Sequence, residues 1–208
     1  MPATGDPQLG EDFEEALAYA VEVHRGQLRK GTGAPYTAHL LAVSSLVLEH
    51  GGDEQTAIAA LLHDAAEDQG GEERLADIEH RFGERVAEIV AACSDTFETP
   101  KPPWRERKEA YLDHLVEADP DALLVSAADK LHNARSILAD HRDQGEELWS
   151  IFTTESASDQ LWYYRSLVDA FQRAKARKEV GEGFERLVGK LDRVVTTLEE
   201  RVPVAREG

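Results

Sequence analysis

Apolar residues recur every three to four positions along most of this chain, and no stretch keeps up an alternation of apolar and polar residues. The first spacing is typical of helices with one buried face, whereas sustained alternation is typical of strands. We therefore predict an all-α fold of about eight to ten helices. Their expected ranges are 10–25, 38–50, 53–67, 72–81, 83–95, 103–118, 120–139, 143–152, 157–179 and 182–201.

The breaks between these ranges carry residues that begin or end helices. Asp53 follows two glycines and is expected to cap the next helix, because its carboxylate accepts hydrogen bonds from free amides. Pro120 follows Asp119 and suits the first position of a helix. The Pro-rich stretch 99–103 predicts a stiff loop. The final residues, 201–208, are expected to fray.

The composition is that of an ordinary soluble domain, with 41% hydrophobic and 31% charged residues in 208 positions. We predict a single domain over 1–208, with its core over about 12–175 and a C-terminal helical extension over about 180–202. No apolar run approaches the roughly 18 residues of a membrane span. The acidic N-terminus lacks the basic and apolar segments of a secretory signal, so a cytoplasmic location is predicted.

The formal net charge is −18, which limits the possible partners. It argues against nucleic acid, because that affinity rests on Lys and Arg contacts to phosphates. It also repels any phosphorylated small molecule. If the substrate is such an anion, the site must supply positive charge locally, from a metal ion and a few Lys or Arg side chains.

Four ionisable residues lie within six positions at the end of a buried helix. The run 56–62 is apolar on nearly all sides, and His63, Asp64, Glu67 and Asp68 follow it directly. Burial of such groups costs several kcal/mol each unless they are paired or bind a cation. The segment therefore indicates a buried metal site, with a hydrogen-bonded His–Asp pair as the alternative.

Two further positions complete a candidate ligand set. Asp129 follows an apolar run, and His39 opens an apolar helix. With His63 and Asp64 they form a mixed nitrogen and oxygen set, which suits Mn²⁺, with Fe²⁺, Co²⁺, Zn²⁺ or Mg²⁺ as alternatives. Four protein ligands leave about two positions of an octahedral ion, for a nucleophilic water and a phosphoryl oxygen. The pattern predicts a metal-dependent phosphohydrolase.

Five short motifs occur in a fixed order along the chain. They occupy residues 24–30, 35–39, 61–68, 82–83 and 128–135. Together they resemble the hydrolase domain of RelA/SpoT homologues, a group within the HD phosphohydrolase superfamily. The similarity runs from about residue 12 to about residue 175 and looks closest to the small stand-alone hydrolases of the metazoan SpoT homologue type.

The resemblance implies an HD-domain helical bundle and cleavage of the 3′-pyrophosphate from guanosine tetra- and pentaphosphate alarmones, with Mn²⁺. It implies that His39, His63, Asp64 and Asp129 bind the metal. Glu67 and Asp68 match the family's acidic pair, which orients or deprotonates the attacking water. Arg29 and Lys30 match the pair that contacts the nucleotide, and Asn133 matches a residue that contacts its sugar and phosphate region.

Two segments match less closely. Arg107 and Lys108 lie in a stretch that aligns with a basic segment near the substrate phosphates. Tyr163 is the best match to a substrate-contacting tyrosine. The family carries an arginine one turn before that tyrosine, where this chain has none. Arg165 is the candidate replacement, and loss of that phosphate contact is the alternative. His132 adjoins Asp129 and is expected to serve packing, with a role beside the site as the alternative.

Three functions stay open at this point. The first is an alarmone 3′-pyrophosphohydrolase. The second keeps the metal chemistry but acts on another nucleotide, such as an adenosine alarmone, NADPH or a nucleoside phosphate. The third is a nucleotide-sensing or toxin-neutralising protein in which turnover is secondary. In each case the ligand is a small nucleotide, with neither nucleic acid nor a membrane as partner. The sequence leaves the native metal and the oligomeric state open.

Overall fold

The computed structural model describes residues 9–98, 100–154 and 156–202. Over these ranges the chain forms ten α-helices and one 3₁₀ helix, and no strand beyond an isolated bridge between Leu28 and Pro35. The elements are α1 (Glu11–Val23), α2 (Thr37–Glu49), α3 (Glu54–Leu62), α4 (Ala65–Asp68), α5 (Gly71–Phe82), α6 (Glu84–Cys93), α7 (Trp104–Glu117), α8 (Pro120–Gln144), η1 (Gly145–Ile151), α9 (Ala157–Arg177) and α10 (Glu182–Arg201). The predicted all-α helical fold is confirmed.

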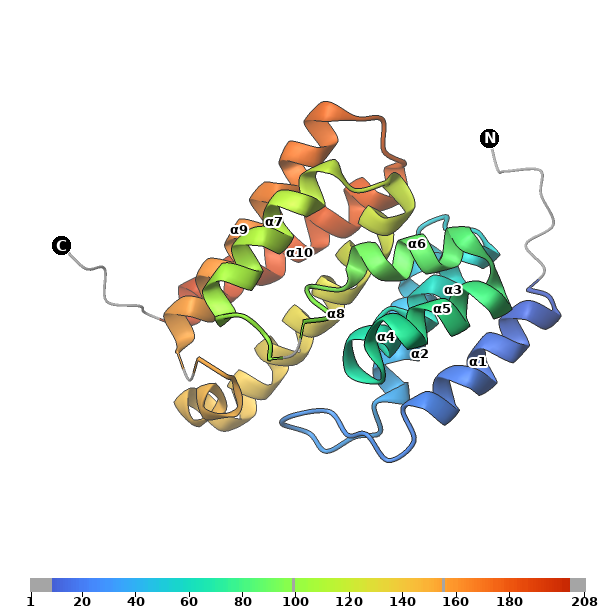
Figure 1. Ribbon diagram of the computed structural model, residues 1–208. Coiled ribbons are helices and arrows are strands. Elements are labelled where there is room, and N and C mark those ends of the chain that lie inside the picture. Colours follow the sequence, from blue (N-terminus) through green and yellow to red (C-terminus); the bar gives the residue numbers. More distant parts are fainter. Residues whose placement is uncertain (1–8, 99, 155, 203–208) are drawn as a thin grey trace.

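Helix α8 is the centre of the arrangement. It packs against α2, α3 and α6 on one side and against α9 and α10 on the other. Figure 1 shows α8 between a group formed by α1 to α6 and a group formed by α7, α9 and α10. The first half of α8 is apolar nearly all round, and Leu123, Val125, Ala127, Ala128 and Leu131 are completely buried. The core therefore surrounds α8, and any polar residue on its inner face lies deep in the molecule.

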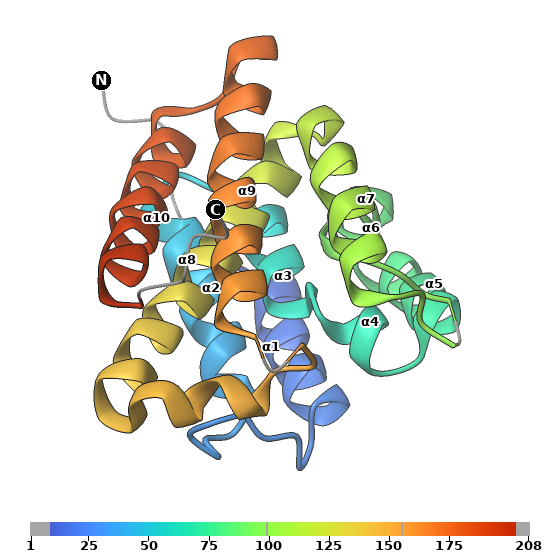
Figure 2. The ribbon, with the colours of Figure 1, turned by 90° about the vertical axis from the view of Figure 1, so that its left-hand side faces the viewer.

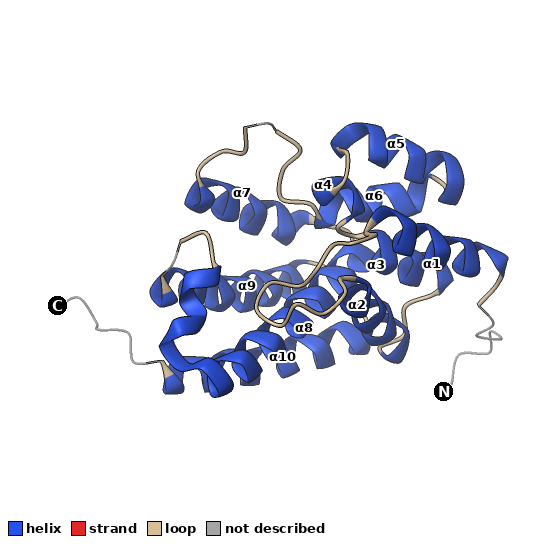
Figure 3. Ribbon diagram, turned by 90° about the horizontal axis from the view of Figure 1, so that it is seen from below, coloured by secondary structure: helices blue, strands red, loops and turns tan. Residues whose placement is uncertain are grey.

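The outer helices complete the bundle. Figure 2 shows α9 and α10 running beside each other, and their contact closes one flank of α8. Figure 3, the view from below, shows helices joined only by loops. None of the described helices is long and apolar enough to cross a membrane.

The predicted cap at Asp53 and the predicted place of Pro120 at a helix start are confirmed, and the structure adds a second cap at Asp119. The Asp53 carboxylate accepts a hydrogen bond from the Thr56 amide at 2.9 Å. The Asp119 carboxylate accepts one from the Asp121 amide at 3.1 Å, and Pro120 occupies the first turn of α8. These contacts satisfy amides that a helix start otherwise leaves without a partner.

The expected helix 53–67 is wrong, because the chain leaves the helix at His63 and Asp64. Helix α3 ends at Leu62 and α4 begins at Ala65. Asp64 has φ −98° and ψ −4°, in the sparsely populated bridge region. On a continuous helix, adjacent side chains point about 100° apart. The turn instead brings both side chains to one side, where the site lies.

The boundary expected at residues 139–143 is also wrong. Helix α8 continues to Gln144 and is followed by the 3₁₀ helix η1 instead of a further α-helix. The first residue able to stop α8 is Gly145, whose φ of +63° lies in the left-handed region that favours glycine.

The predicted loop 99–103 begins at Thr99, and the predicted frayed tail is mostly 203–208. Both Thr99 and 203–208 lie outside the described residues.

Helix α10 approaches the end of α2 at Gly183. A Cβ atom at this position would stand 1.6 Å from the backbone oxygen of His50. Further along α10, the Lys190 ammonium lies 2.8 Å from Nε2 of His50. We expect Gly183→Ala to lower the free energy of unfolding by about 2 kcal/mol or more, because the two helices must separate. Urea unfolding measures this loss.

Gly189 provides the matched control on the same helix. A Cβ atom there would meet only the end of the Arg193 side chain, at 3.7 Å. Gly189→Ala should raise the free energy of unfolding by up to about 1 kcal/mol, the difference in helix propensity. Equal effects of the two substitutions would show that α10 does not dock through Gly183.

Candidate functional site

Three separate elements bring the four predicted metal ligands together. His39 comes from α2, His63 and Asp64 from the turn between α3 and α4, and Asp129 from the middle of α8. Nε2 of His63 lies 3.0 Å from an Asp64 oxygen, and Nε2 of His39 lies 3.2 Å from an Asp129 oxygen. The two crossed pairs, His39 with Asp64 and His63 with Asp129, are each 3.6 Å apart. The four side chains thus surround one point.

The protonation of His63 suits a metal ion at that point. Its Nδ1 lies 2.9 Å from the Ala60 carbonyl oxygen and donates to it, which leaves a lone pair on Nε2. Among the described residues, Nε2 of His63 and Nε2 of His39 are buried without a hydrogen-bond partner. A nitrogen lone pair directed at carboxylates needs a cation between them, and either a proton or a divalent metal ion can supply it. The donor set therefore fits a divalent metal.

The charges of this cluster are strongly coupled. Burial disfavours a charged His63, but the carboxylates of Asp64 and Asp129 outweigh it and raise the pKa of His63. Burial likewise disfavours the charged carboxylates. The His63 and His39 imidazoles nevertheless hold the pKa of Asp64 well below its usual range, and Lys130 and the imidazoles do the same for Asp129. Both carboxylates are therefore available as anionic ligands at neutral pH.

His132 contacts the cluster through His39. Its Nδ1 lies 2.8 Å from Nδ1 of His39. Burial and the neighbouring charges of His39 and Arg29 lower the pKa of His132 to about 4, so this ring is neutral at pH 7. A neutral His132 accepts the Nδ1 proton of His39 and leaves Nε2 of His39 free to face the cluster. His132 therefore contacts His39 directly, which agrees with the alternative of a role beside the site and goes beyond the packing role expected first.

Three more side chains hold the two carboxylates in place. The Tyr36 hydroxyl donates to Asp64 at 2.5 Å. Lys130 donates to one Asp129 oxygen at 2.7 Å, and Asn133 donates to the other at 2.5 Å. Sequence reasoning missed Lys130 and Tyr36, although both lie inside motifs that it singled out. The adjacency of Lys130 to Asp129 was the available signal.

A cleft opens beside this cluster, formed by two adjoining pockets of about 390 and 400 Å³. Both pockets are lined by Lys30, Asp68, Asn133, Phe152 and Tyr164. Five cationic side chains line the second pocket: Lys30, Lys101, Arg107, Lys108 and Lys130. Three carboxylates, those of Glu67, Asp68 and Asp95, line the same pocket, so its cations outnumber its anions by five to three. In a chain of net charge −18, this local excess of positive charge can hold an anion that the rest of the molecule repels.

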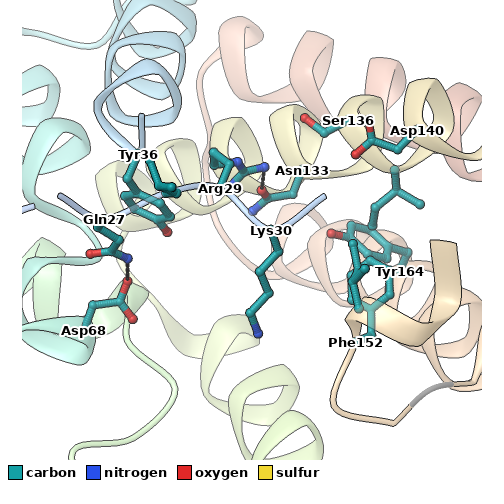
Figure 4. Close-up of a pocket in the computed structure, with 13 residues that line it drawn as sticks. Gln27, Arg29, Lys30, Tyr36, Asp68, Asn133, Ser136, Asp140, Phe152 and Tyr164 are labelled. Atoms are coloured by element: carbon teal, nitrogen blue, oxygen red, sulfur yellow. Dashed lines mark hydrogen bonds between the residues drawn. The ribbon is translucent and has the colours of Figure 1, made fainter. Parts of the chain in front are cut away.

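Arg29, Lys30 and Asn133 meet at the first pocket (Figure 4). The Arg29 guanidinium donates to the Asn133 side-chain oxygen at 2.8 Å and lies 5.8 Å from the centre of the Tyr36 ring. Lys30 extends away from this pair, as Figure 4 shows, and its ammonium has no hydrogen-bond or ion-pair partner among the described residues. A flat guanidinium beside an unpaired ammonium can receive a base and a phosphate.

Glu67 and Asp68 both line the second pocket. Glu67 accepts hydrogen bonds from the Lys101 ammonium at 2.9 Å and from the Asp95 amide at 3.1 Å. Asp68 accepts one from the Gln27 side chain at 2.7 Å (Figure 4). Burial raises the pKa of both carboxyls; the charge of Asp95 adds to the shift of Glu67, and that of Asp64 adds to the shift of Asp68. A carboxylate with a raised pKa is a better proton acceptor.

Arg107, Lys108 and Tyr163 also face the second pocket. Asp95, whose side chain is 4% exposed, forms ion pairs with Arg107 and, at 2.6 Å, with Lys108. The Lys108 ammonium lies 5.1 Å from the centre of the Tyr163 ring. The Tyr163 hydroxyl is buried and has no hydrogen-bond partner among the described residues. These groups can therefore donate to an anion in the pocket.

The suggestion that Arg165 replaces the missing family arginine is wrong. Its guanidinium binds Asp192 and Glu199 of α10, both at 2.6 Å, and it lines neither pocket. Residues two apart on a helix do not share a face. Since Tyr163 faces the cleft, Arg165 must point elsewhere.

The ion pairs of Asp95 carry a prediction for stability. We expect Asp95→Asn to lower the free energy of unfolding at pH 7 by about 3 kcal/mol, because two partly buried cations lose their counter-charge. Although burial opposes it, the charges of Lys108 and Arg107 lower the pKa of Asp95 in the folded protein. Its contribution is present above the unfolded pKa and is lost as pH falls through the folded value. Urea unfolding at pH 7 and in acid measures the difference.

Asp113 on α7 is exposed, and Asp113→Asn is the matched control, with an expected change within about 0.5 kcal/mol. A loss in Asp95→Asn that stayed constant down to low pH would mean that shape, not charge, makes the contribution.

The comparisons with known proteins agree with this geometry. The chain matches the HD domain family over residues 16–154. It is 38% identical over 126 residues to "Guanosine-3′,5′-bis(diphosphate) 3′-pyrophosphohydrolase MESH1" of Xenopus tropicalis, a match that covers 59% of this chain and 68% of that protein. It is 35% identical over 131 residues to the Aquifex aeolicus protein named guanosine-3′,5′-bis(diphosphate) 3′-pyrophosphohydrolase, where the match covers 63% of this chain but only 18% of the relative.

Two solved structures share the fold. The first, described as "A metazoan ortholog of SpoT hydrolyzes ppGpp and plays a role in starvation responses", has a TM-score of 0.72 and 26% sequence identity, over 94% of this chain and 98% of that one. A Listeria monocytogenes protein has a TM-score of 0.62 and 28% identity, over 79% of this chain and 99% of that one. The family match, the relatives and the arrangement of His39, His63 and Asp129 all agree: this chain belongs to the HD domain family.

Proposed function

We propose that this chain is a guanosine-3′,5′-bis(diphosphate) 3′-pyrophosphohydrolase, which releases pyrophosphate from guanosine tetra- or pentaphosphate and leaves GDP or GTP. One observation carries the proposal. A buried cluster of histidine lone pairs and carboxylates adjoins a cleft lined by five cations. The names of the Xenopus and Aquifex relatives give the substrate class.

In this proposal His39, His63, Asp64 and Asp129 hold one divalent ion, which we infer to be Mn²⁺. When bound, such an ion lowers the pKa of a water molecule and polarises a phosphoryl oxygen. Tyr36 and Asn133 keep the two carboxylates oriented through their hydrogen bonds. Lys130 contacts Asp129 and also lines the cleft, so it can meet the phosphate that is attacked.

Glu67 takes the proton from the attacking water, and Asp68 orients that water. The Lys101 ammonium and the Asp95 amide fix the Glu67 carboxylate in one position. Gln27 does the same for Asp68. Positioning of both carboxylates before substrate arrives avoids reorganisation during the reaction.

The remaining cleft residues bind the nucleotide. Arg29 and Asn133 contact the base and the sugar, and Lys30 contacts a phosphate. Arg107, Lys108 and the Tyr163 hydroxyl bind the pyrophosphate that leaves. The ion pairs of Arg107 and Lys108 with Asp95 support this role, because they hold both cations at the pocket wall.

Incubation of the purified chain with Mn²⁺ and guanosine tetraphosphate tests the proposal. GDP and pyrophosphate should appear in equal amounts, separated by anion-exchange chromatography. An adenosine alarmone and NADPH, assayed in parallel, serve as the competing substrates. Absence of product from protein with one bound Mn²⁺ per chain would refute the proposed reaction. Faster release of phosphate from NADPH would support the metal-dependent chemistry but would show that the proposed substrate is wrong.

A further inference from the structure

One carboxylate in the first pocket has no role in the reaction proposed above. Asp140 lies on α8 and lines this pocket with Arg29 and Ser136 (Figure 4). Its side chain has no hydrogen-bond or ion-pair partner among the described residues and is partly buried. Burial raises the pKa of its carboxyl, and the nearby Arg29 guanidinium acts against that shift. An unpaired acceptor thus faces a space large enough for a ligand.

The position of Asp140 along α8 relates it to the cluster of metal ligands. Asp129, Asn133, Ser136 and Asp140 are spaced by three or four residues, so they follow one face of the helix. Asn133 touches Asp129, and Asp140 stands seven residues further on, about 10 Å along the axis at 1.5 Å per residue. A nucleotide whose 3′-phosphates face the cluster therefore has its base at the Asp140 end.

The surroundings of Asp140 suit a flat, uncharged ring system. Apolar and aromatic side chains are among the residues that line this pocket with Asp140, namely Leu28, Ile137, Ile151, Phe152 and Tyr164. The backbone at Gly31 rests against this wall, since a Cβ atom there would stand 3.1 Å from an Asp140 oxygen and 3.3 Å from Ile151. A carboxylate here repels phosphate, so it favours a nucleotide orientation in which the phosphates lie in the second pocket, among its cationic side chains.

An ionised carboxylate only accepts hydrogen bonds, and this property distinguishes the purines. Guanine offers two adjacent donors, N1–H and the N2 amino group. Adenine places an acceptor, N1, beside its one donor group. Paired with adenine, the carboxylate would face a lone pair and lose one of two hydrogen bonds.

We propose that Asp140 is a specificity residue that binds the N1–H and N2 amino donors of guanine and so selects guanosine over adenosine nucleotides. The inference rests on the proposed function, because it names the base of the substrate at that same site. A site built to hydrogen-bond its ligand rejects an analogue that lacks the matching group. Wild-type kcat/KM should therefore favour the guanosine over the adenosine 3′,5′-bis(diphosphate) by roughly 100-fold or more.

The variant Asp140→Asn provides a change of specificity that a purely structural role would not produce. Xanthine keeps N1–H but carries an oxygen in place of the 2-amino group. The asparagine oxygen can accept from N1–H while its amide donates to that oxygen. In Asp140→Asn, kcat/KM for the guanosine substrate should fall by about 10- to 100-fold, and the xanthosine analogue should become the better substrate. Asp143→Asn, an exposed position on the same helix, is the control and should keep the wild-type preference.

Pyrophosphate release from the three 3′,5′-bis(diphosphates) measures these values in the Mn²⁺-loaded chain. Unchanged base ratios in Asp140→Asn, or a wild-type protein that accepts the adenosine analogue equally well, would overturn the inference. Calorimetric titration with GDP, ADP and XDP gives a second readout that needs no turnover, with the same order of preference expected. Absence of pyrophosphate release from every nucleotide would refute the proposed function, whereas the order of the three dissociation constants would still decide the role of Asp140.

Discussion

His63→Ala is expected to yield a folded protein with almost no bound metal and with kcat/KM reduced about 1,000-fold or more. A bound metal ion stabilises such a transition state by several kcal/mol, and each 1.36 kcal/mol changes the rate tenfold. Without the His63 nitrogen, three ligands remain: His39, Asp64 and Asp129. Metal analysis by mass spectrometry, together with the pyrophosphate assay, measures both effects.

His80→Ala is the matched control, because His80 is exposed on α5. It should bind one metal ion per chain and keep the wild-type rate. Full metal content in His63→Ala would mean that the cluster is not the metal site. Full activity in a metal-free His63→Ala protein would mean that the reaction does not use the ion.

Glu67→Gln is expected to keep its metal and its fold but to lose about 10²- to 10⁴-fold in kcat, the usual contribution of a general base. The amide can still accept from the Asp95 backbone, but it cannot take a proton from water. Burial and the charge of Asp95 raise the pKa of Glu67, so the wild-type rate should fall as pH drops through that raised value. This acidic limb should be absent from the residual rate of Glu67→Gln.

Glu79→Gln, at an exposed position on α5, is the control for the loss of one negative charge and should leave the profile unchanged. If Glu67→Gln lost its metal, Glu67 would be a ligand. If the variant kept the wild-type rate and its acidic limb, another group would be the proton acceptor.

Local patterns in the sequence were sufficient for most of the helices and for the cap at Asp53. An aspartate before a helix accepts from amides two or three residues ahead, which sequence reveals directly. The break at His63 and Asp64 was not predictable in this way. The apolar run before it continues without glycine or proline, and the turn depends on contacts of His63 and Asp64 with distant residues of α2 and α8.

The candidate site shows the same division. That His39, His63, Asp64 and Asp129 lie together could be predicted because they stand in short motifs with an apolar approach. The contact of His132 with His39 joins residues 93 positions apart, and nothing in the local sequence separates it from ordinary packing. Arg165 was a wrong candidate for the phosphate contact, and helical geometry alone could have excluded it. Tyr163 and Arg165 point about 200° apart on α9, so they cannot both face the cleft.

Helix α8 has a consequence for how this chain can vary. Its one continuous stretch carries Asp129, one of the four proposed metal ligands, and Asp140, which lines the first pocket of the cleft. Insertion of a single residue between them would rotate every later side chain by about 100° and shift it by about 1.5 Å. In the proposed arrangement, nucleotide preference can therefore change through substitutions at the cleft-facing positions of α8, whereas an insertion or deletion between Asp129 and Asp140 would break the alignment of the two ends of the cleft.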